Sequence, residues 1–180
     1  LISITILSCK PVCNTDAYNA VAAVYAFAVA YPEDFPQYVI ENKVALTSAK
    51  IFDHCIDRFS AALLASAISS PSRIDIEERS MRIASDAGNP AMAMQLADDM
   101  METSGDLYRL SGFMQQIKNS VPEILNGNVQ SFYNTEIYQL SALMWNMSKQ
   151  ILYPQQIKAI RDMTYRISYW YVSNLSLSIK

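Results

Sequence analysis

The segment Asp53–Asp57, which reads DHCID, holds the residue types most able to do chemistry in this chain. A cysteine nucleophile needs a base within hydrogen-bond reach, and His54 is the only histidine present. Adjacent residues on a helix point about 100° apart, so His54 and Cys55 do not readily act on one substrate. Asp57 lies one turn from His54 and could orient it, but we expect an exposed helix face here.

Metal and cofactor chemistry is limited by the same single histidine. Di-iron bundles need two Glu-x-x-His pairs, and HExxH or three-histidine zinc sites need more than one histidine. The acidic pairs at 33–34, 77–78 and 98–99 are neighbours in sequence, and helical neighbours do not face each other across a cleft. The four glycines form no phosphate-binding loop. We therefore predict a protein without catalytic residues, metal ligands or cofactor, which is not an enzyme.

The three cysteines leave their pairing open. Cys55 shares a helix face with Phe52 and Ile56, so one interpretation is a buried, inert thiol. The alternative is a disulfide from Cys9 or Cys13 to Cys55, which would tie the amino-terminal segment to a helix.

The opening residues, LISITILSC, have three interpretations. They fit the apolar part of a secretory signal, and ILSC resembles the bacterial lipoprotein box, which would place a lipid on Cys9. We favour the third interpretation, an ordered segment of the mature chain. We expect a secreted or cell-surface protein, with a cytoplasmic location left open.

Composition excludes several classes of partner. Only 17% of the 180 residues are charged, against about 25% in an average soluble domain, while 51% are apolar. The 14 lysines and arginines form no basic stripe, so we expect no nucleic-acid binding. The longest apolar run has 12 residues, fewer than the roughly 18 of a membrane span, so we expect no transmembrane segment.

Helical periodicity dominates the chain and predicts the fold class. Apolar residues step by three and four along several segments, and Pro154 is well placed to begin the last helix. The main stripes are Leu107–Leu110–Met114–Ile117, Tyr133–Ile137–Leu140–Met144–Met147–Ile151 and Ile157–Ile160–Thr164–Ile167–Tyr171. A further helix is expected from about residue 36 to residue 69, with a break inside, and others at 72–87 and after Pro90. We predict one all-α domain over residues 1–180, a bundle of six or seven helices.

The first helix is expected at the centre of this bundle. Residues 20–31 read AVAAVYAFAVAY, with six alanines and no polar face apart from tyrosine hydroxyls. A helix that is apolar all round is normally enclosed by others, and Asn14, Thr15 or Asp16 can cap it. The ends of the chain differ, because Ile2, Ile4 and Ile6, and likewise Leu175, Leu177 and Ile179, alternate with hydroxyl residues. Alternation is typical of strands, so a short two-stranded terminal ribbon is an alternative.

Two functions fit these features. The first is a helical interaction or structural module that self-associates or docks a protein partner through the outward side of the last helix. The candidate interface residues are Arg161, Tyr165, Arg166, Tyr169 and Trp170. The second is a carrier that holds a lipid or other apolar ligand in a cavity lined by the nine methionines, which are flexible and suit adaptable binding sites. No motif in the sequence identifies a family.

Overall fold

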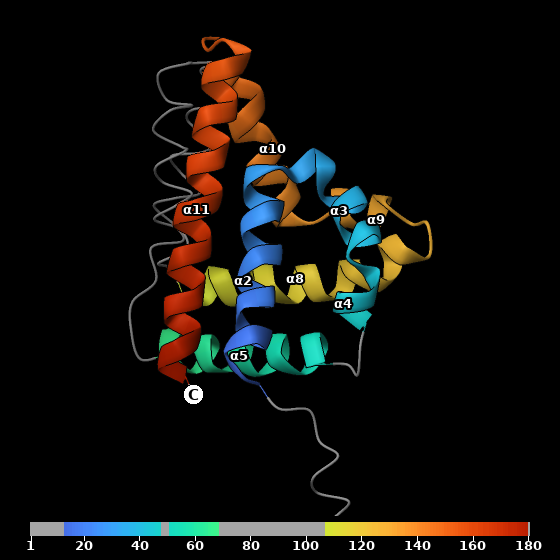
Figure 1. Cartoon of the computed structure of the whole chain (residues 1–180), viewed down its shortest axis with the longest axis vertical. Coiled ribbons are helices and arrows are strands. Elements are labelled where there is room, and N and C mark those ends of the chain that lie inside the picture. Colours follow the sequence, from blue (N-terminus) through green and yellow to red (C-terminus); the bar gives the residue numbers. More distant parts are fainter. Residues whose placement is uncertain (1–12, 48–50, 69–106, 180) are drawn as a thin grey trace, which may run out of the picture.

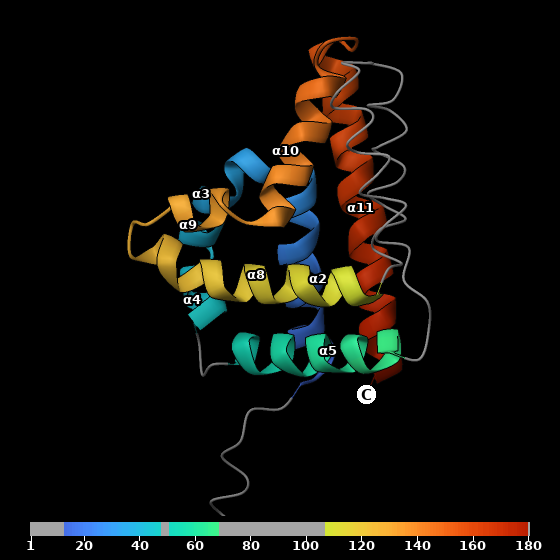
Figure 2. The same ribbon diagram turned by 180° about the vertical axis from the view of Figure 1, so that it is seen from behind.

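The computed structural model describes residues 13–47, 51–68 and 107–179, and every regular element in these ranges is a helix (Figures 1 and 2). The all-α prediction is therefore confirmed for this part of the chain. Its elements are α2 (Thr15–Ala30), the 3₁₀ turn η1 (Pro32–Asp34), α3 (Phe35–Glu41), α4 (Lys43–Thr47), α5 (Ile51–Ile68), α8 (Leu107–Leu125), α9 (Gln130–Tyr133), α10 (Glu136–Ser148) and α11 (Pro154–Ile179). The helices predicted at 72–87 and after Pro90 lie outside the described residues.

Helix α2 begins where the sequence predicts. The side chain of Asn14 accepts a hydrogen bond from the backbone N–H of Ala17 at 2.9 Å, which caps the first turn. Buried residues lie on all sides of α2, because it packs against α11, α5, α10 and α8. Figures 1 and 2 show α2 and α11 upright and side by side, with α5 and α8 running across them as a second pair.

The seam between α2 and α11 is the most extensive helix contact of the described chain. The buried residues of α2 are mostly alanines and valines, and on α11 the buried side chains beyond Ile157 and Arg161 are small: Thr164, Ser168, Val172 and Ser176. Small residues let two helix backbones approach closely, and the alanine-rich sequence of α2 predicts such an approach.

One expectation for α11 is wrong. The predicted inward stripe includes Ile167, which is 41% exposed, whereas Arg161, expected on the outer face, is 5% exposed. Ile157 and Thr164 are buried as predicted, but Ser168 and Val172 are buried in place of Ile167 and Tyr171, a shift of the buried face by one residue. The reason is that α2 accepts small side chains closely, so Thr164, Ser168 and Val172 are turned inward in preference to the bulkier Ile167.

The other stripes are placed as predicted, with one change of boundary. Leu110, Met114 and Ile117 are fully buried on α8, and Pro154 is the first residue of α11. The long stripe from residue 133 to residue 151 divides, since Thr135 caps a new helix, α10, through the backbone N–H of Tyr138. Ile151 follows the end of α10 and is 44% exposed.

The terminal ribbon is wrong for its carboxyl-terminal half. Residues 175–179 continue α11, because further helical turns satisfy their backbone groups and bury Ser176 beside Val172. Its other half, Ile2, Ile4 and Ile6, and with it the question of the opening segment, lies outside the described residues. None of the described helices combines the length and apolarity needed to cross a membrane.

Cys13, just before α2, forms a disulfide with Cys55 in α5. The two Cα atoms are 5.4 Å apart and the residues are 42 positions apart in sequence. Cys55 is fully buried, so the bridge joins the start of the central helix to the core. Cys9, the other predicted partner, lies outside the described residues.

Removing this disulfide should lower the free energy of unfolding by about 4 kcal/mol, the loop-closure value for a crosslink of this span. Urea unfolding of Cys13→Ser, compared with wild-type protein, measures the loss. Reduction with dithiothreitol should lower the urea midpoint of the wild-type protein to that of Cys13→Ser, and should leave the midpoint of Cys13→Ser unchanged. An unchanged wild-type midpoint after reduction would show that the bridge does not stabilise the fold.

Candidate functional site

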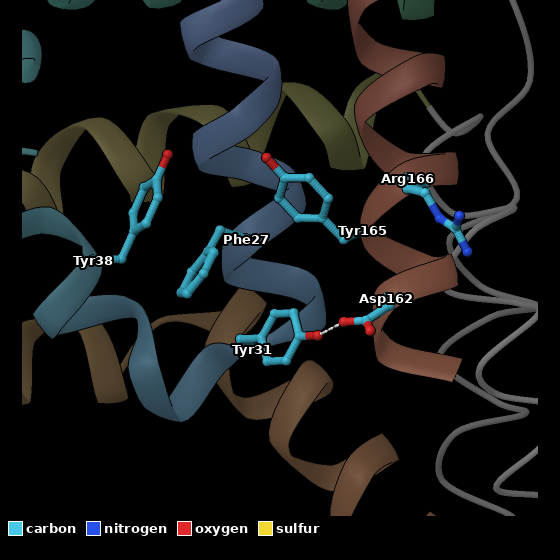
Figure 3. A pocket seen from close by; sticks show the side chains of 6 residues that line it. All are labelled: Phe27, Tyr31, Tyr38, Asp162, Tyr165 and Arg166. Carbon is cyan, nitrogen blue, oxygen red and sulfur yellow. Dashed lines mark hydrogen bonds between the residues drawn. The ribbon is translucent and has the colours of Figure 1, made fainter. Parts of the chain in front are cut away.

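An aromatic cavity of about 600 Å³ lies between α2, α3 and α11 (Figure 3). Its walls come from the neighbouring segments α2 and α3 and from α11, which is more than a hundred residues further along the chain. They are formed by Phe27, Tyr31, Tyr38, Asp162, Tyr165 and Arg166. Figure 3 shows the four rings gathered around this hollow, whereas the guanidinium of Arg166 points away from them. We call this hollow the aromatic cavity.

Local sequence explains how the rings reach the cavity. Phe27 and Tyr31 are one helical turn apart at the end of α2, so they lie on one side of it. Pro32 starts η1 and ends α2, which turns the chain so that Tyr38 on α3 stacks on Phe27 with ring centroids 4.2 Å apart. Tyr165 completes the wall from α11 and stacks on Tyr169 at 6.2 Å.

A hydrogen bond from the Tyr31 hydroxyl to the Asp162 carboxylate closes one side of the cavity. Lys158 also donates to Asp162, at 2.9 Å. These two hydrogen bonds hold the pKa of Asp162 below its usual value. Burial and the hydrogen bond to Asp162 raise the pKa of Tyr31 to about 12. At neutral pH the pair is thus a neutral phenol donating to a carboxylate.

Two further phenol hydroxyls belong to the cavity. Burial, and to a lesser degree the proximity of Tyr165, raises the pKa of Tyr38 to about 12. Burial followed by the influence of Tyr169 raises the pKa of Tyr165 as well. Both phenols therefore stay protonated at neutral pH and can donate hydrogen bonds to an acceptor in the cavity. Both tyrosine side chains are half-buried, and neither hydroxyl is among the buried polar atoms that lack a hydrogen-bond partner.

A second, smaller cavity of about 330 Å³ shares Tyr31 with the aromatic cavity and lies at the start of α11. Its lining comprises Tyr31, Glu33, Lys149, Pro154, Ile157, Lys158 and Arg161, and the surface that these residues present to the cavity is mostly apolar. Arg161 is buried, pairs with Glu33, and lies over the ring of Trp145 with its Cζ 4.9 Å from the centroid. We call it the smaller cavity.

No protein-family model, curated protein or solved structure matches this chain. We therefore infer function from the side chains, charges and cavities of the described residues.

The five predicted interface residues do not form one surface. Arg161 is inside, Tyr165 forms a cavity wall, and Tyr169 is half-buried beside it. Arg166 and Trp170 are exposed, and Trp170, at 64%, is one of the most exposed large side chains in the described residues. The α11 rotation by one residue separates these side chains into an inner and an outer group.

In the DHCID segment, Asp57 pairs with a lysine of another helix and not with His54. His54 is exposed on α5, Cys55 is in the disulfide, and Asp57 pairs with Lys118 of α8 at 2.7 Å. Partial burial raises the pKa of Asp57, but hydrogen bonds from Lys118 and Gln115 outweigh it and lower the pKa overall. Asp57 thus holds α5 to α8. Among the described residues, no three His, Cys, Asp or Glu side chains lie together as a metal site.

The cavity residues Phe27, Tyr31 and Tyr38 were missed at the level of sequence. The sequence predicts a wholly buried helix for Phe27 and Tyr31, and places Tyr38 in the next helix. The available signal was the aromatic pair at i, i+4 followed directly by Pro32, which predicts rings at the exit of a helix.

The described residues do not form the methionine-lined cavity that the sequence predicts for an apolar ligand. Met114, Met144 and Met147 are packed in the core, whereas Met163 is 51% exposed. Neither cavity described above has a methionine in its lining. The remaining five methionines lie outside the described residues.

Tyr31 should stabilise the fold in a pH-dependent way. Its pKa is raised from 10.0 in the unfolded chain to about 12, so its contribution is fully present below pH 10 and is lost as the pH rises toward 12. The difference in unfolding free energy between wild type and Tyr31→Phe should stay constant up to about pH 10 and then shrink. Urea unfolding across this range measures it. Tyr153→Phe, at a 73% exposed tyrosine, should show no such trend, and a flat Tyr31→Phe difference through pH 12 contradicts the Tyr31–Asp162 pairing.

Proposed function

We propose that this protein is a non-catalytic binding protein that holds a small, flat, largely apolar molecule in the aromatic cavity. One observation carries the proposal: four half-buried rings, from three separate segments, surround a hollow instead of filling it. This retains the idea of an apolar-ligand carrier and replaces methionines with aromatic side chains as the lining.

The cavity has the size and lining of a ligand site. Sites for small molecules usually measure about 300 to 1,000 Å³ and combine an apolar lining with a few polar groups that orient the ligand. Here Phe27 and Tyr38, already stacked on each other, form a rigid wall against which a planar ring can pack. The protonated hydroxyls of Tyr38 and Tyr165 favour a ligand that carries a hydrogen-bond acceptor, such as a carbonyl oxygen or ring nitrogen.

Its ionisable groups favour binding over catalysis. General acids and bases work best with pKa values near the ambient pH. In this cavity the tyrosine pKa values move up and the pKa of Asp162 moves down, so no group exchanges protons near neutrality.

The disulfide supports an oxidising compartment. Stable disulfides are rare in the reducing cytosol and common in secreted proteins. The Cys13–Cys55 bridge therefore favours a secreted or cell-surface location for the binding protein.

N-phenyl-1-naphthylamine is a neutral fluorophore made of a naphthalene and a phenyl ring. One molecule should bind per protein chain in the aromatic cavity, and its fluorescence should increase. Tyr165→Ala removes one ring of the wall and should weaken binding roughly tenfold, the upper range of an aromatic contact. Fluorescence titration measures both dissociation constants.

The matched control is Tyr153→Ala, which removes a 73% exposed tyrosine that lines neither cavity. Near-ultraviolet circular dichroism checks that both variants are folded. Equal affinities for the two variants, or no binding by folded wild-type protein, would reject the aromatic cavity as a ligand site.

A second candidate function is self-association through α11. Met163, Ile167 and Trp170 follow one another at i, i+4 and i+7 and are 51%, 41% and 64% exposed. Arg166 is the one charged residue between Met163 and Trp170. A second copy of the chain, presenting the same uncharged stripe, is the occupant that this face fits best.

If two copies pair through this stripe, Trp170→Ala should weaken the dimer about thirtyfold, the effect of losing a central tryptophan contact of about 2 kcal/mol. Light scattering after size-exclusion chromatography over a wide concentration range measures the dimer constant. Tyr153→Ala should leave it unchanged. A wild-type chain that stays monomeric up to millimolar concentration rules out this candidate.

A further inference from the structure

Tyr31 belongs to the linings of both cavities. Among the described residues, the aromatic cavity and the smaller cavity have only this side chain in common. Phe27, which lines the aromatic cavity, has its ring centroid 5.4 Å from that of Tyr31. Arg161, which lines the smaller cavity, places its Cζ over the same ring, 5.6 Å from the centroid. The ring of Tyr31 therefore contacts the lining of each cavity and forms part of the wall between them.

An ion pair continues this wall from α2 to α11. Tyr31 donates to the carboxylate of Asp162, which lines the aromatic cavity (Figure 3). Lys158, which lines the smaller cavity, donates to the same carboxylate at 2.9 Å. One residue of each cavity is thus tied to the other, and the Tyr31 hydroxyl is tied to both through Asp162.

Three interactions hold the Tyr31 side chain in this position. The guanidinium of Arg161 lies over its ring and adds cation–π attraction, and the ring of Phe27 packs beside it. The hydrogen bond to Asp162 fixes its far end. Because the pKa of Tyr31 is raised to about 12, the hydroxyl keeps its proton and this hydrogen bond persists throughout the neutral range. A side chain held at both its ring and its hydroxyl acts as a fixed wall.

The smaller cavity would otherwise suit an alkyl chain. The surface that its lining presents is mostly apolar, and its volume is about 330 Å³. Each methylene group that leaves water for such a surface increases affinity by roughly fourfold. A ligand seated in the aromatic cavity could collect this gain only by passing the Tyr31 ring.

We propose that Tyr31 is a specificity-determining residue, which closes the aromatic cavity against the smaller cavity. The ligand is then a compact, planar ring system without a long alkyl chain, and fatty acids and acyl lipids are poor ligands. This inference rests on the function proposed above and narrows its ligand class.

Two homologous fluorophores test the role of Tyr31. 6-Propionyl-2-(dimethylamino)naphthalene and its hexanoyl homologue are neutral and share one planar ring system and one carbonyl oxygen, but differ in chain length. Wild-type protein should bind the two with dissociation constants within about threefold of each other, because the longer chain stays in water. Tyr31→Ala opens the wall and should bind the hexanoyl homologue at least about tenfold more tightly than the propionyl one, since its additional methylenes enter the smaller cavity. Fluorescence titration measures all four constants.

Two further variants complete the test. Tyr153→Ala removes a 73% exposed tyrosine that lines neither cavity, and should keep the wild-type ratio of affinities. Tyr31→Leu retains an apolar side chain at the end of α2, and should show the preference of Tyr31→Ala to a smaller degree. Near-ultraviolet circular dichroism identifies the variants that are folded.

The outcomes separate this inference from the proposed function. A tenfold preference of wild-type protein for the hexanoyl homologue would overturn the role of Tyr31, as would the same affinity ratio in wild-type protein and the folded Tyr31 variants. Either result leaves the aromatic cavity standing as a ligand site. If neither fluorophore binds folded wild-type protein, the proposed function and this inference fail together.

Discussion

The close seam between α2 and α11 is the constraint on which the rest of the described structure depends. Alanines along α2 leave room for another helix backbone, and Thr164, Ser168 and Val172 fill that room with small side chains. Burying these particular residues fixes the rotation of α11 about its own axis. That rotation places Arg161 inside, Tyr165 at the aromatic cavity and Trp170 in solvent, so one packing requirement sets three environments.

Burying the charged guanidinium of Arg161 costs desolvation free energy, which interactions with the surrounding residues offset. A buried charge needs a counter-charge and hydrogen bonds, and here Glu33, on η1, supplies the counter-charge. The faces of Trp145 and Tyr31 lie 4.9 and 5.6 Å from the guanidinium and add cation–π attraction. Trp145 in turn donates through Nε1 to the carbonyl oxygen of Val29 at 2.9 Å. The end of α2, η1, α10 and the first turns of α11 are thereby joined at one polar centre.

Sequence reasoning could predict the helices and most of their buried faces. Stepping by three and four is a local property, so Leu110, Met114 and Ile117 were placed correctly, as were the cap at Asn14 and the start at Pro154. The rotation of α11 could not be predicted, since it depends on how closely another helix approaches. The terminal strand failed for a related reason: a short alternation of Leu and Ser fits a continuing helix when that helix already has a partner.

The cavities were beyond sequence reasoning for a stronger reason. Tyr165 lies more than a hundred residues after Phe27 and Tyr38 in the sequence, and the bend at Pro32 together with the seam brings the three rings to one place. A cavity also exists where side chains fail to fill the space between helices, and the order of residue types in a sequence does not show where that happens. Likewise, the unpaired Nε of Arg161 follows from its burial against Trp145, not from its place in the sequence.

The arrangement of these rings supports the proposed binding function. Rings that cannot fill their own hollow leave apolar surface that a planar ligand can cover, at a gain of roughly 25 cal/mol for each Å² removed from water. The tyrosine hydroxyls keep their protons and the carboxylate of Asp162 keeps its charge across the neutral range, so the polar groups present one fixed pattern of donors and charges. A fixed pattern discriminates among ligands, because a molecule that fails to match it leaves buried polar groups unpaired. In the proposed binding function, selectivity would come from the same contacts that keep α2, α3 and α11 in place.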